Sequence, residues 1–266
     1  MDLNGAHVVI TGASRGIGAA MAKAFAAAGA NLSLAARSAD GLASVADPIG
    51  GRVFPVDLLD QDQTEGLVER IEAEAGPIDV LVNNAGVEGT SLVHKVDVDM
   101  VRRIARLNLE APMVLTRQVL PGMLERNRGH LVFTSSLAGT SGFPGLASYG
   151  ATKAGISNYA AALRLELRDT EIGTTVVAPG PVDTDMWDDV EAAGDIAPVL
   201  KRLRLFQLIP IRTPDYLAER TAAAVTGNHR HVRTPRRLNS NHWFREAPSR
   251  INEWLMTGVD VGPKRP

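Results

Sequence analysis

The sequence predicts an α/β fold in which one doubly wound parallel sheet of about seven strands carries helices on both faces. Short runs of β-branched and apolar residues alternate with longer helical patterns as far as Ala178. These runs are apolar throughout, which is typical of parallel strands that are buried on both faces. No internal repeat and no Pro- or Gly-rich linker divides the chain, so residues 1–266 are expected to form a single domain.

The alternation gives the order of the elements along the chain. Strands are expected at 7–11, 31–36, 52–55, 78–83, 129–135 and 174–178. Helices are expected between them at 18–28, 63–75, 99–108 and 149–168. Because a strand, a helix and a second parallel strand join in a right-handed crossover, this order predicts a doubly wound sheet. Ligands of such sheets bind beyond the carboxyl ends of the strands.

The last third of the chain departs from this alternation. A polar loop follows the sixth strand, and after it come an amphipathic segment at 196–206, a helix at 215–225 and a weak strand near 231–234. Residues 185–211 follow the carboxyl end of the sixth strand, so they are expected to cover the ligand site as a lid. The tail at 235–266 is expected to pack against the domain because it contains Trp243, Phe244 and Trp254.

Composition excludes several functional classes. The net charge of −2 gives no reason to expect nucleic-acid or membrane binding. The absence of cysteine excludes thiol nucleophiles, zinc–thiolate sites and disulfides, and it fits a reducing compartment. No set of histidines has metal-ligand spacing, and no window approaches roughly 18 uninterrupted apolar residues. We therefore expect a cytoplasmic protein without a metal site, a membrane span or a secretory signal.

The first predicted strand ends in a glycine-rich turn, Thr11–Gly18 (TGASRGIG), from which an alanine-rich helix starts. Glycine allows a sharp turn and lets the backbone approach a phosphate closely, because no Cβ is in the way. The free N–H groups and the dipole at the N-terminus of the helix attract an anion. The strand, the turn and the helix together predict that the pyrophosphate of a dinucleotide binds here.

Three further motifs follow this turn. They are Asn83–Gly86 (NNAG), Tyr149–Lys153 (YGATK) and Pro179–Thr184 (PGPVDT). With the glycine turn, they resemble the motifs of the short-chain dehydrogenase/reductase family, in that family's order, from about residue 6 to residue 187. The resemblance implies a Rossmann-like domain that transfers a hydride between a nicotinamide cofactor and a small carbonyl or secondary-alcohol substrate. It also implies a homodimer or homotetramer.

The end of the second predicted strand indicates which cofactor is used. NAD-dependent sites usually place an acidic side chain there, which accepts hydrogen bonds from the ribose 2′-hydroxyl. Here the strand runs into Arg37, whose guanidinium suits a 2′-phosphate, and Arg15 in the glycine turn offers a second cation. Basic residues at these two positions go with NADP(H) in the family. We therefore expect NADP(H) as the cofactor.

The resemblance also implies which residues contact the cofactor. Asp57 stands where the family has an acid beside the adenine, and Lys153 stands where it has a lysine bound to the nicotinamide ribose. The segment 179–184 borders the nicotinamide in the family. The expected set is Gly12, Ser14, Arg15, Gly16, Ile17, Gly18, Arg37, Asp57, Asn84, Ala85, Gly86, Tyr149, Lys153, Pro179, Gly180, Val182 and Thr184.

Proton transfer to and from the substrate is assigned to Tyr149. A free tyrosine, whose pKa is near 10, is a poor base at neutral pH. Lys153 lies four residues further along, on the same face of one helix. Its ammonium, together with the positive nicotinamide of the oxidised cofactor, is expected to lower the pKa of the tyrosine.

Two more residues complete the expected catalytic set. Ser136 precedes Tyr149 by 13 residues, the separation usual in the family, so the resemblance implies that its hydroxyl binds the substrate oxygen. The neighbouring Ser135 could be mistaken for it. Asn108 matches the family position that holds a water in a proton relay, although an asparagine inside a helix can also serve only to bond the backbone.

Other functions share this scaffold. A non-redox epimerase, dehydratase or dehalogenase would use the same fold, and a regulator would bind NADP without turnover. Dehalogenase relatives lose the glycine turn and replace the lysine, and regulators usually lose the tyrosine or the lysine. Ser136, Tyr149 and Lys153 are all present here, which favours an enzyme that oxidises or reduces its substrate.

The substrate is expected to contact three segments, 86–95, 138–147 and 185–211. Each of them follows a strand or a motif that borders the expected cofactor site. Their apolar side chains indicate an apolar substrate; these are Leu92, Phe143, Leu146, Met186, Trp187, Leu205 and Phe206.

Overall fold

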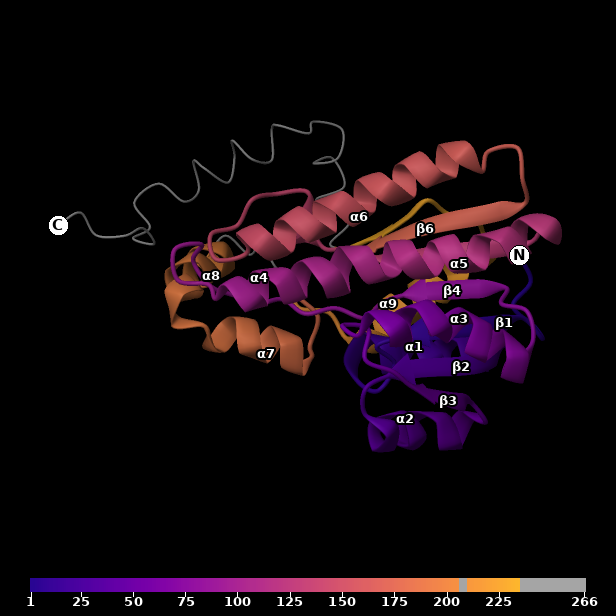
Figure 1. The fold of residues 1–266 in the computed structure, drawn as a ribbon. Helices are drawn as coiled ribbons and strands as arrows, with labels where there is room; N and C mark the ends of the chain where they lie inside the picture. Colours follow the sequence, from indigo (N-terminus) through magenta and orange to yellow (C-terminus); the bar gives the residue numbers. More distant parts are fainter. Residues whose placement is uncertain (206–209, 235–266) are drawn as a thin grey trace.

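The computed structural model describes residues 1–205 and 210–234. Its strands are β1 (His7–Thr11), β2 (Asn31–Ala36), β3 (Arg52–Pro55), β4 (Val80–Asn83), β5 (Gly129–Thr134), β6 (Ile172–Ala178) and β7 (His231–Arg233). They form one seven-stranded sheet in the order β3-β2-β1-β4-β5-β6-β7, and every neighbouring pair is parallel (Figure 1). The strand order reverses beside β1, so the predicted doubly wound fold is confirmed.

The strand positions agree closely with the prediction from the sequence. β1, β2 and β3 have the predicted bounds, β4 begins two residues later, β5 and β7 each end one residue earlier, and β6 begins two residues earlier. Every residue of β1, β4 and β6 is buried. Burial on both faces explains why these strands are read as unbroken apolar runs.

Helices cover both faces of the sheet (Figure 1). Their apolar sides meet the strands in two core clusters, one on each face. One face carries α1 (Gly16–Ala27), α2 (Ala39–Ala46) and α9 (Pro214–Thr226), and α1 packs against α9 although the two are far apart in the sequence. The other face carries α3 (Gln61–Ala75), α5 (Ala111–Glu125) and α6 (Ala147–Glu166).

Three helices lie where none was expected: α2, α5 and α7 (Asp185–Ala192). The helix α5 contains Pro112 and Pro121, and proline usually ends a helix. Pro112 is the second residue of α5 and comes directly after a π-helical turn, and Pro121 lies inside the helix. The helix α7 begins with Asp185 and Asp188 in its first turn, where the helix dipole favours negative charge. The polar loop expected after the sixth strand therefore contains a helix.

The helix expected at 99–108 is part of a longer one. The helix α4 (Val98–Ala105) continues into a π-helical turn, η2 (Arg106–Glu110), and then directly into α5. In this turn the N–H of Ala111 donates to the carbonyl oxygen of Arg106, five residues earlier. Such turns inside α-helices are frequent at functional sites, and this one contains Asn108.

The chain after β6 forms a small cap at one end of the sheet. The helices α7 and α8 (Ala197–Leu205) lie together there (Figure 1). They are joined by a cluster of buried apolar side chains, Val190, Ile196 and Leu200. Phe206 and the predicted tail at 235–266 lie outside the described residues. Among the residues that are described, no helix is long and apolar enough to span a membrane.

Candidate active site

Two glycines of the turn after β1 lie too close to other backbone atoms for any side chain. At Gly12, whose φ is +68°, a Cβ would lie 2.8 Å from the Cα of Ala85. At Gly18 a Cβ would lie 2.2 Å from the carbonyl oxygen of Gly12. Both positions therefore require glycine, and the turn can pack directly against the chain that follows β4.

The N-terminus of α1 offers backbone N–H groups to a ligand. Its N-cap residue, Arg15, makes no side-chain hydrogen bond to the helix, and the first turn contains no acidic residue. The first N–H groups of a helix have no partner within the helix, and the helix dipole places positive charge beside them. This glycine turn and helix end fit the pyrophosphate of a dinucleotide.

Asn84 connects the ends of three strands beneath this turn. Its Nδ2 donates to the carbonyl oxygen of Thr11 at 3.1 Å, and its backbone N–H donates to Thr11 Oγ1 at 3.0 Å. Its Oδ1 accepts a hydrogen bond from Thr134 Oγ1 at 3.3 Å. The side chain thus holds the carboxyl ends of β1, β4 and β5 together, which fixes the floor of the site.

A groove of about 520 Å³ lies along these strand ends. Every residue of the expected cofactor set lines it except Gly180 and Val182, which line an adjoining pocket. Arg37 lies at this groove, exposed, and makes no hydrogen bond or ion pair with a described residue. The predicted cofactor residues, which lie between Gly12 and Thr184 in the sequence, are therefore brought together around two adjoining cavities.

Arg15 pairs with an acidic residue of the cap. Its Nη1 lies 2.6 Å from Asp185 Oδ2 at the start of α7, and the two side chains are 70% and 69% exposed. An ion pair this exposed contributes roughly 0–1 kcal/mol, so a bound phosphate can compete with it for the guanidinium.

Tyr149 and Lys153 lie near each other on α6. The Nζ of Lys153 is 5.6 Å from the centroid of the Tyr149 ring, and it donates to the carbonyl oxygen of Thr134 at 2.8 Å. Lys153 is only 4% exposed, and this burial lowers its pKa to about 8. An ammonium has three donors, so Lys153 can still donate hydrogen bonds to a ligand in the groove.

The pKa of Tyr149 is raised in the structure. Burial, which is the largest cause, and the negative charge of Glu88 together raise this pKa to about 12, and a hydrogen bond with Ser136 acts in the opposite direction. The phenol therefore holds its proton at neutral pH. The expectation that Lys153 lowers the pKa concerns the phenol beside the oxidised cofactor, and it stays a prediction.

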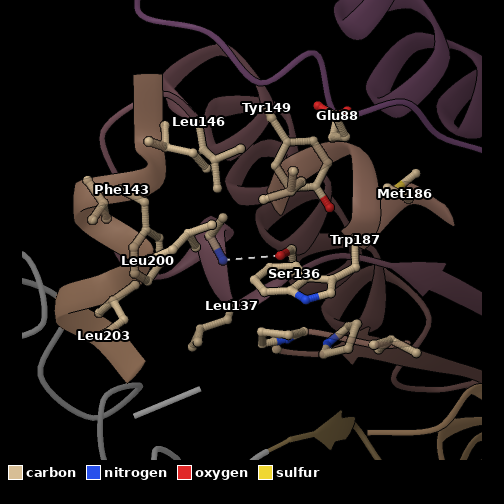
Figure 2. A pocket seen from close by; sticks show the side chains of 18 of the residues that line it. Glu88, Ser136, Leu137, Phe143, Leu146, Tyr149, Met186, Trp187, Leu200 and Leu203 are labelled. Atoms are coloured by element: carbon tan, nitrogen blue, oxygen red, sulfur yellow. Dashed lines mark hydrogen bonds between the residues drawn. The ribbon is translucent and has the colours of Figure 1, made fainter. Parts of the chain in front are cut away.

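The two serines after β5 have different surroundings. Ser135 is buried, and its Oγ donates to the carbonyl oxygen of Lys153 at 2.8 Å and shares a hydrogen bond with Ser157 Oγ at 2.7 Å. Ser136 lines a pocket beside Tyr149, and its Oγ accepts from the N–H of Ala138 at 3.2 Å (Figure 2). Of the two hydroxyls, that of Ser136 is the one placed to meet a substrate.

Asn108 is 1% exposed and is bound to the backbone after β4. Its Oδ1 accepts from the N–H of Val87 at 2.9 Å, and its Nδ2 donates to the carbonyl oxygen of Val87 at 2.8 Å. Gly86 lies close to both Asn108 and Lys153. A Cβ at Gly86 would be 3.0 Å from Asn108 Oδ1 and 3.5 Å from Lys153 Nζ. Asn108 therefore fixes the chain that passes Lys153.

A mostly apolar pocket adjoins the groove (Figure 2). Tyr149 lines both cavities, and in Figure 2 its hydroxyl points toward Ser136. The phenol therefore stands where a molecule in the groove and a molecule in the pocket would meet. The apolar walls come from the loop before α6, from α7 and from α8, and include Phe143, Leu146, Met186, Trp187, Leu200 and Leu203.

A model of the family described as short chain dehydrogenase matches residues 6–194, which is more than half of the chain. The chain belongs to the short-chain dehydrogenase/reductase family. The resemblance seen in the four sequence motifs is therefore confirmed, and the glycine turn, the groove and the Tyr149–Lys153 pair all lie within the matched residues.

Individual members of the short-chain dehydrogenase/reductase family are similar over most of the chain. The 3-oxoacyl-(acyl-carrier-protein) reductase FabG of Escherichia coli is 35% identical over 238 residues, which are 87% of this chain and 97% of the relative. Ketoacyl reductase HetN of Nostoc is 39% identical over 185 residues, 68% of this chain and 64% of the relative. A solved structure of a short chain dehydrogenase/reductase family protein has a TM-score of 0.74 at 26% identity and covers 88% of this chain and 97% of its own.

Membership in this family makes the chain an oxidoreductase that uses a nicotinamide cofactor. The residues fit such a group, because the glycine turn excludes side chains, the N-terminus of α1 is free to bind an anion, and the groove reaches from that turn to Tyr149. The groove therefore offers residues for the whole dinucleotide, from Arg37 and Asp57 through the glycine turn to Tyr149.

The walls of the apolar pocket differ in part from the prediction. Phe143, Leu146, Met186 and Trp187 line it as expected, whereas Leu92 does not, and Leu205 is 75% exposed. Glu88, which also lines the pocket, lies in the expected segment 86–95 but was not named individually. A single glutamate in a loop has no periodicity that would single it out.

Proposed function

We propose that the protein is an NADP(H)-dependent dehydrogenase/reductase that interconverts an apolar carbonyl compound and its secondary alcohol. The observation that supports this proposal most strongly is the position of Tyr149, which borders both the groove and the apolar pocket. A cofactor in the groove and a substrate in the apolar pocket would meet at this phenol. The phenol is therefore suited to exchange a proton with the substrate while the substrate carbon reacts with the cofactor.

The reaction follows from the groups around the phenol. A bound nicotinamide cofactor supplies or accepts the hydride. Ser136 donates a hydrogen bond to the substrate oxygen, where negative charge develops during reduction. Tyr149 then gives its proton to that oxygen, and its raised pKa keeps it protonated before the step. In the oxidative direction Tyr149 takes the proton back.

Lys153 and Asn108 support the phenol. When Tyr149 has lost its proton, the nearby ammonium of Lys153 stabilises the phenolate. Asn108 holds the chain beside Lys153 through Val87, and we assign to it and Lys153 the path by which the phenol regains a proton from water. Lys153 also has donors left for the ribose of the cofactor.

The proposed preference for NADP(H) rests on Arg37. Its guanidinium is exposed, unpaired among the described residues and located at the groove, where no acidic side chain follows β2 to accept a ribose hydroxyl. Arg15 adds a second positive charge, although Asp185 neutralises part of it. Together they favour a cofactor that carries a 2′-phosphate.

Ser136→Ala is expected to lower kcat by roughly 10²–10³, the usual cost of removing one donor to a developing oxyanion. Ser135→Ala is the matched control, because that hydroxyl bonds Lys153 and Ser157 instead of facing the pocket. It should cost about 1 kcal/mol of stability and little turnover. Steady-state kinetics and thermal unfolding of both variants test this, and an equal loss of kcat in the two would contradict the role of Ser136.

Asp185→Ala is expected to tighten NADPH binding by up to about fivefold, since it frees Arg15 from an exposed ion pair worth at most about 1 kcal/mol. Calorimetric titration of NADPH and NADH into both proteins measures the effect. NADH has no 2′-phosphate, so its Kd should not change. A similar shift for both cofactors would mean that α7 acts on the site by another route.

We also propose that residues 185–211 act as a lid and that copies of the chain form a homodimer or homotetramer. The lid assignment is supported by the pocket walls that α7 and α8 supply. An ion pair of 2.6 Å between Lys95 and Asp195 also links this segment to the loop after β4.

The proposed association of copies of the chain is supported by exposed apolar side chains on α4, α5 and α6, such as Val101, Leu124 and Leu165.

A further inference from the structure

Glu88 is an unusual component of the apolar pocket. It is the only charged side chain among the described residues that line it. A carboxylate beside apolar walls loses part of its hydration, which is unfavourable unless other groups compensate. Its charge also raises the pKa of Tyr149, so it disfavours the phenolate on which oxidation depends. Neither effect helps the proton transfer proposed above.

The carboxylate of Glu88 is held at one oxygen. Its Oε2 accepts from the backbone N–H of Thr90 and, at 2.8 Å, from the hydroxyl of the same residue. Gly89 between them has a φ of +58°, and a Cβ there would lie 2.7 Å from Ile104 Cδ1, so the tight turn requires glycine. The other oxygen, Oε1, has no hydrogen bond with a described residue. In Figure 2 the Glu88 side chain lies close to Tyr149 in the wall of the pocket.

We infer that the substrate carries a hydroxyl group on the carbon next to its reacting carbonyl carbon, and that this hydroxyl donates a hydrogen bond to Glu88 Oε1. The inference rests on the proposed function, because it assumes that Ser136 and Tyr149 receive the carbonyl oxygen. The rest of the substrate then lies against Phe143 and Trp187. The substrate class is an apolar α-hydroxyketone, or the corresponding vicinal diol in the oxidative direction.

The number of free acceptors favours a hydroxyl over other polar groups. An ammonium group on the substrate would bring three hydrogen-bond donors into this pocket. Glu88 offers only Oε1 to them and the walls are mostly apolar, so some of these donors would be left without partners. A substrate carboxylate would be repelled by Glu88. A hydroxyl has a single donor, and the free oxygen satisfies it.

The test compares three ketones of equal chain length: 1-hydroxy-2-octanone, 1-methoxy-2-octanone and 2-octanone. The purified protein should reduce the hydroxyketone with a kcat/KM roughly 10- to 100-fold above that of 2-octanone, the range for a hydrogen bond to a charged group. In Glu88→Gln, Thr90 should retain the amide oxygen, which turns the NH₂ group toward the pocket. The preference for the hydroxyketone should then disappear, and the methoxyketone, which only accepts, should improve.

Two controls keep the result specific. Glu125→Gln makes the same change at an exposed position of α5 and should leave all three rates unaltered. Glu88→Ala removes the acceptor outright and should also abolish the preference for the hydroxyketone.

In the pH profile of reduction, Glu88→Gln should move the alkaline limb to lower pH, because it removes the charge that raises the pKa of Tyr149. A residue that only supports the loop would not move this limb.

The outcomes separate this inference from the function on which it rests. Turnover of all three ketones with the same relative rates in the unaltered protein and in Glu88→Gln would overturn the role of Glu88 and leave the reductase proposal standing. Absence of turnover for any ketone or for the corresponding alcohols, with either nicotinamide cofactor, would overturn both.

Discussion

Replacing Tyr149 with phenylalanine should lower kcat by about 10²–10⁴ and leave the affinity for the cofactor nearly unchanged. General acid catalysis by a positioned side chain typically contributes this much to the rate, and Phe retains the ring but not the proton. The affinity should persist because the glycine turn, the N-terminus of α1 and Lys153 remain in place. Single-turnover reduction measured by NADPH absorbance, with calorimetric titration of the cofactor, reports both quantities.

Tyr159→Phe is the matched control for this variant. Tyr159 lies on the same helix, α6, and packs edge-on against Phe133 with the ring centroids 5.8 Å apart. It lines neither the groove nor the apolar pocket. Its hydroxyl should affect stability and not turnover. Near-normal kcat in Tyr149→Phe would show that another group supplies the proton.

Arg37→Asp should reverse the cofactor preference. The change removes charge-assisted hydrogen bonds to the 2′-phosphate, worth about 1.5–3 kcal/mol, and adds a repulsive charge beside it. We expect kcat/KM for NADPH to fall by roughly 100-fold or more. With NADH the same quantity should rise, because a carboxylate in this position accepts hydrogen bonds from the ribose 2′-hydroxyl.

The comparison needs both cofactors in every protein. Arg117→Asp makes the same change of charge on the exposed side of α5, away from the groove, and should leave the preference as it is. If Arg37→Asp and the unaltered protein gave the same Michaelis constants for NADPH and NADH, Arg37 would not bind the 2′-phosphate. The assignment of NADP(H) would then lose its main support.

Much of the fold could be predicted because local patterns and tertiary structure agree. The strands β1 and β2 are short, mostly apolar runs, and the sheet buries all of β1 and the middle of β2. The helix α5 was missed because Pro112 and Pro121 are read as helix breakers, whereas in the structure Pro112 directly follows the π-helical turn η2 and Pro121 lies inside the helix. The helix α7 was missed because acidic residues that stabilise a helix start also look like an exposed loop.

Residues of the candidate site could be predicted where one short sequence motif contains all the residues that act together. Gly12, Tyr149 and Lys153 belong to such motifs and lie at the groove. Ser136 was chosen over Ser135 by its separation from Tyr149, and only the structure gives the physical difference, because Ser135 Oγ contacts Lys153 whereas Ser136 lines the apolar pocket. The raised pKa of Tyr149 could not be predicted from the sequence, since burial and Glu88, which is distant in the sequence, cause it.

The burial of Lys153 makes the active site costly for the stability of the fold. A lysine whose pKa falls from 10.5 in the unfolded chain to about 8 in the native protein destabilises the native state by roughly 3 kcal/mol at neutral pH. This destabilisation of the native state is fully present below about pH 8. It disappears as the pH rises toward 10.5, where the lysine of the unfolded chain also gives up its proton. Domains of this kind are typically stable by only about 5–15 kcal/mol. Selection for heat resistance alone would therefore favour an uncharged residue at this position.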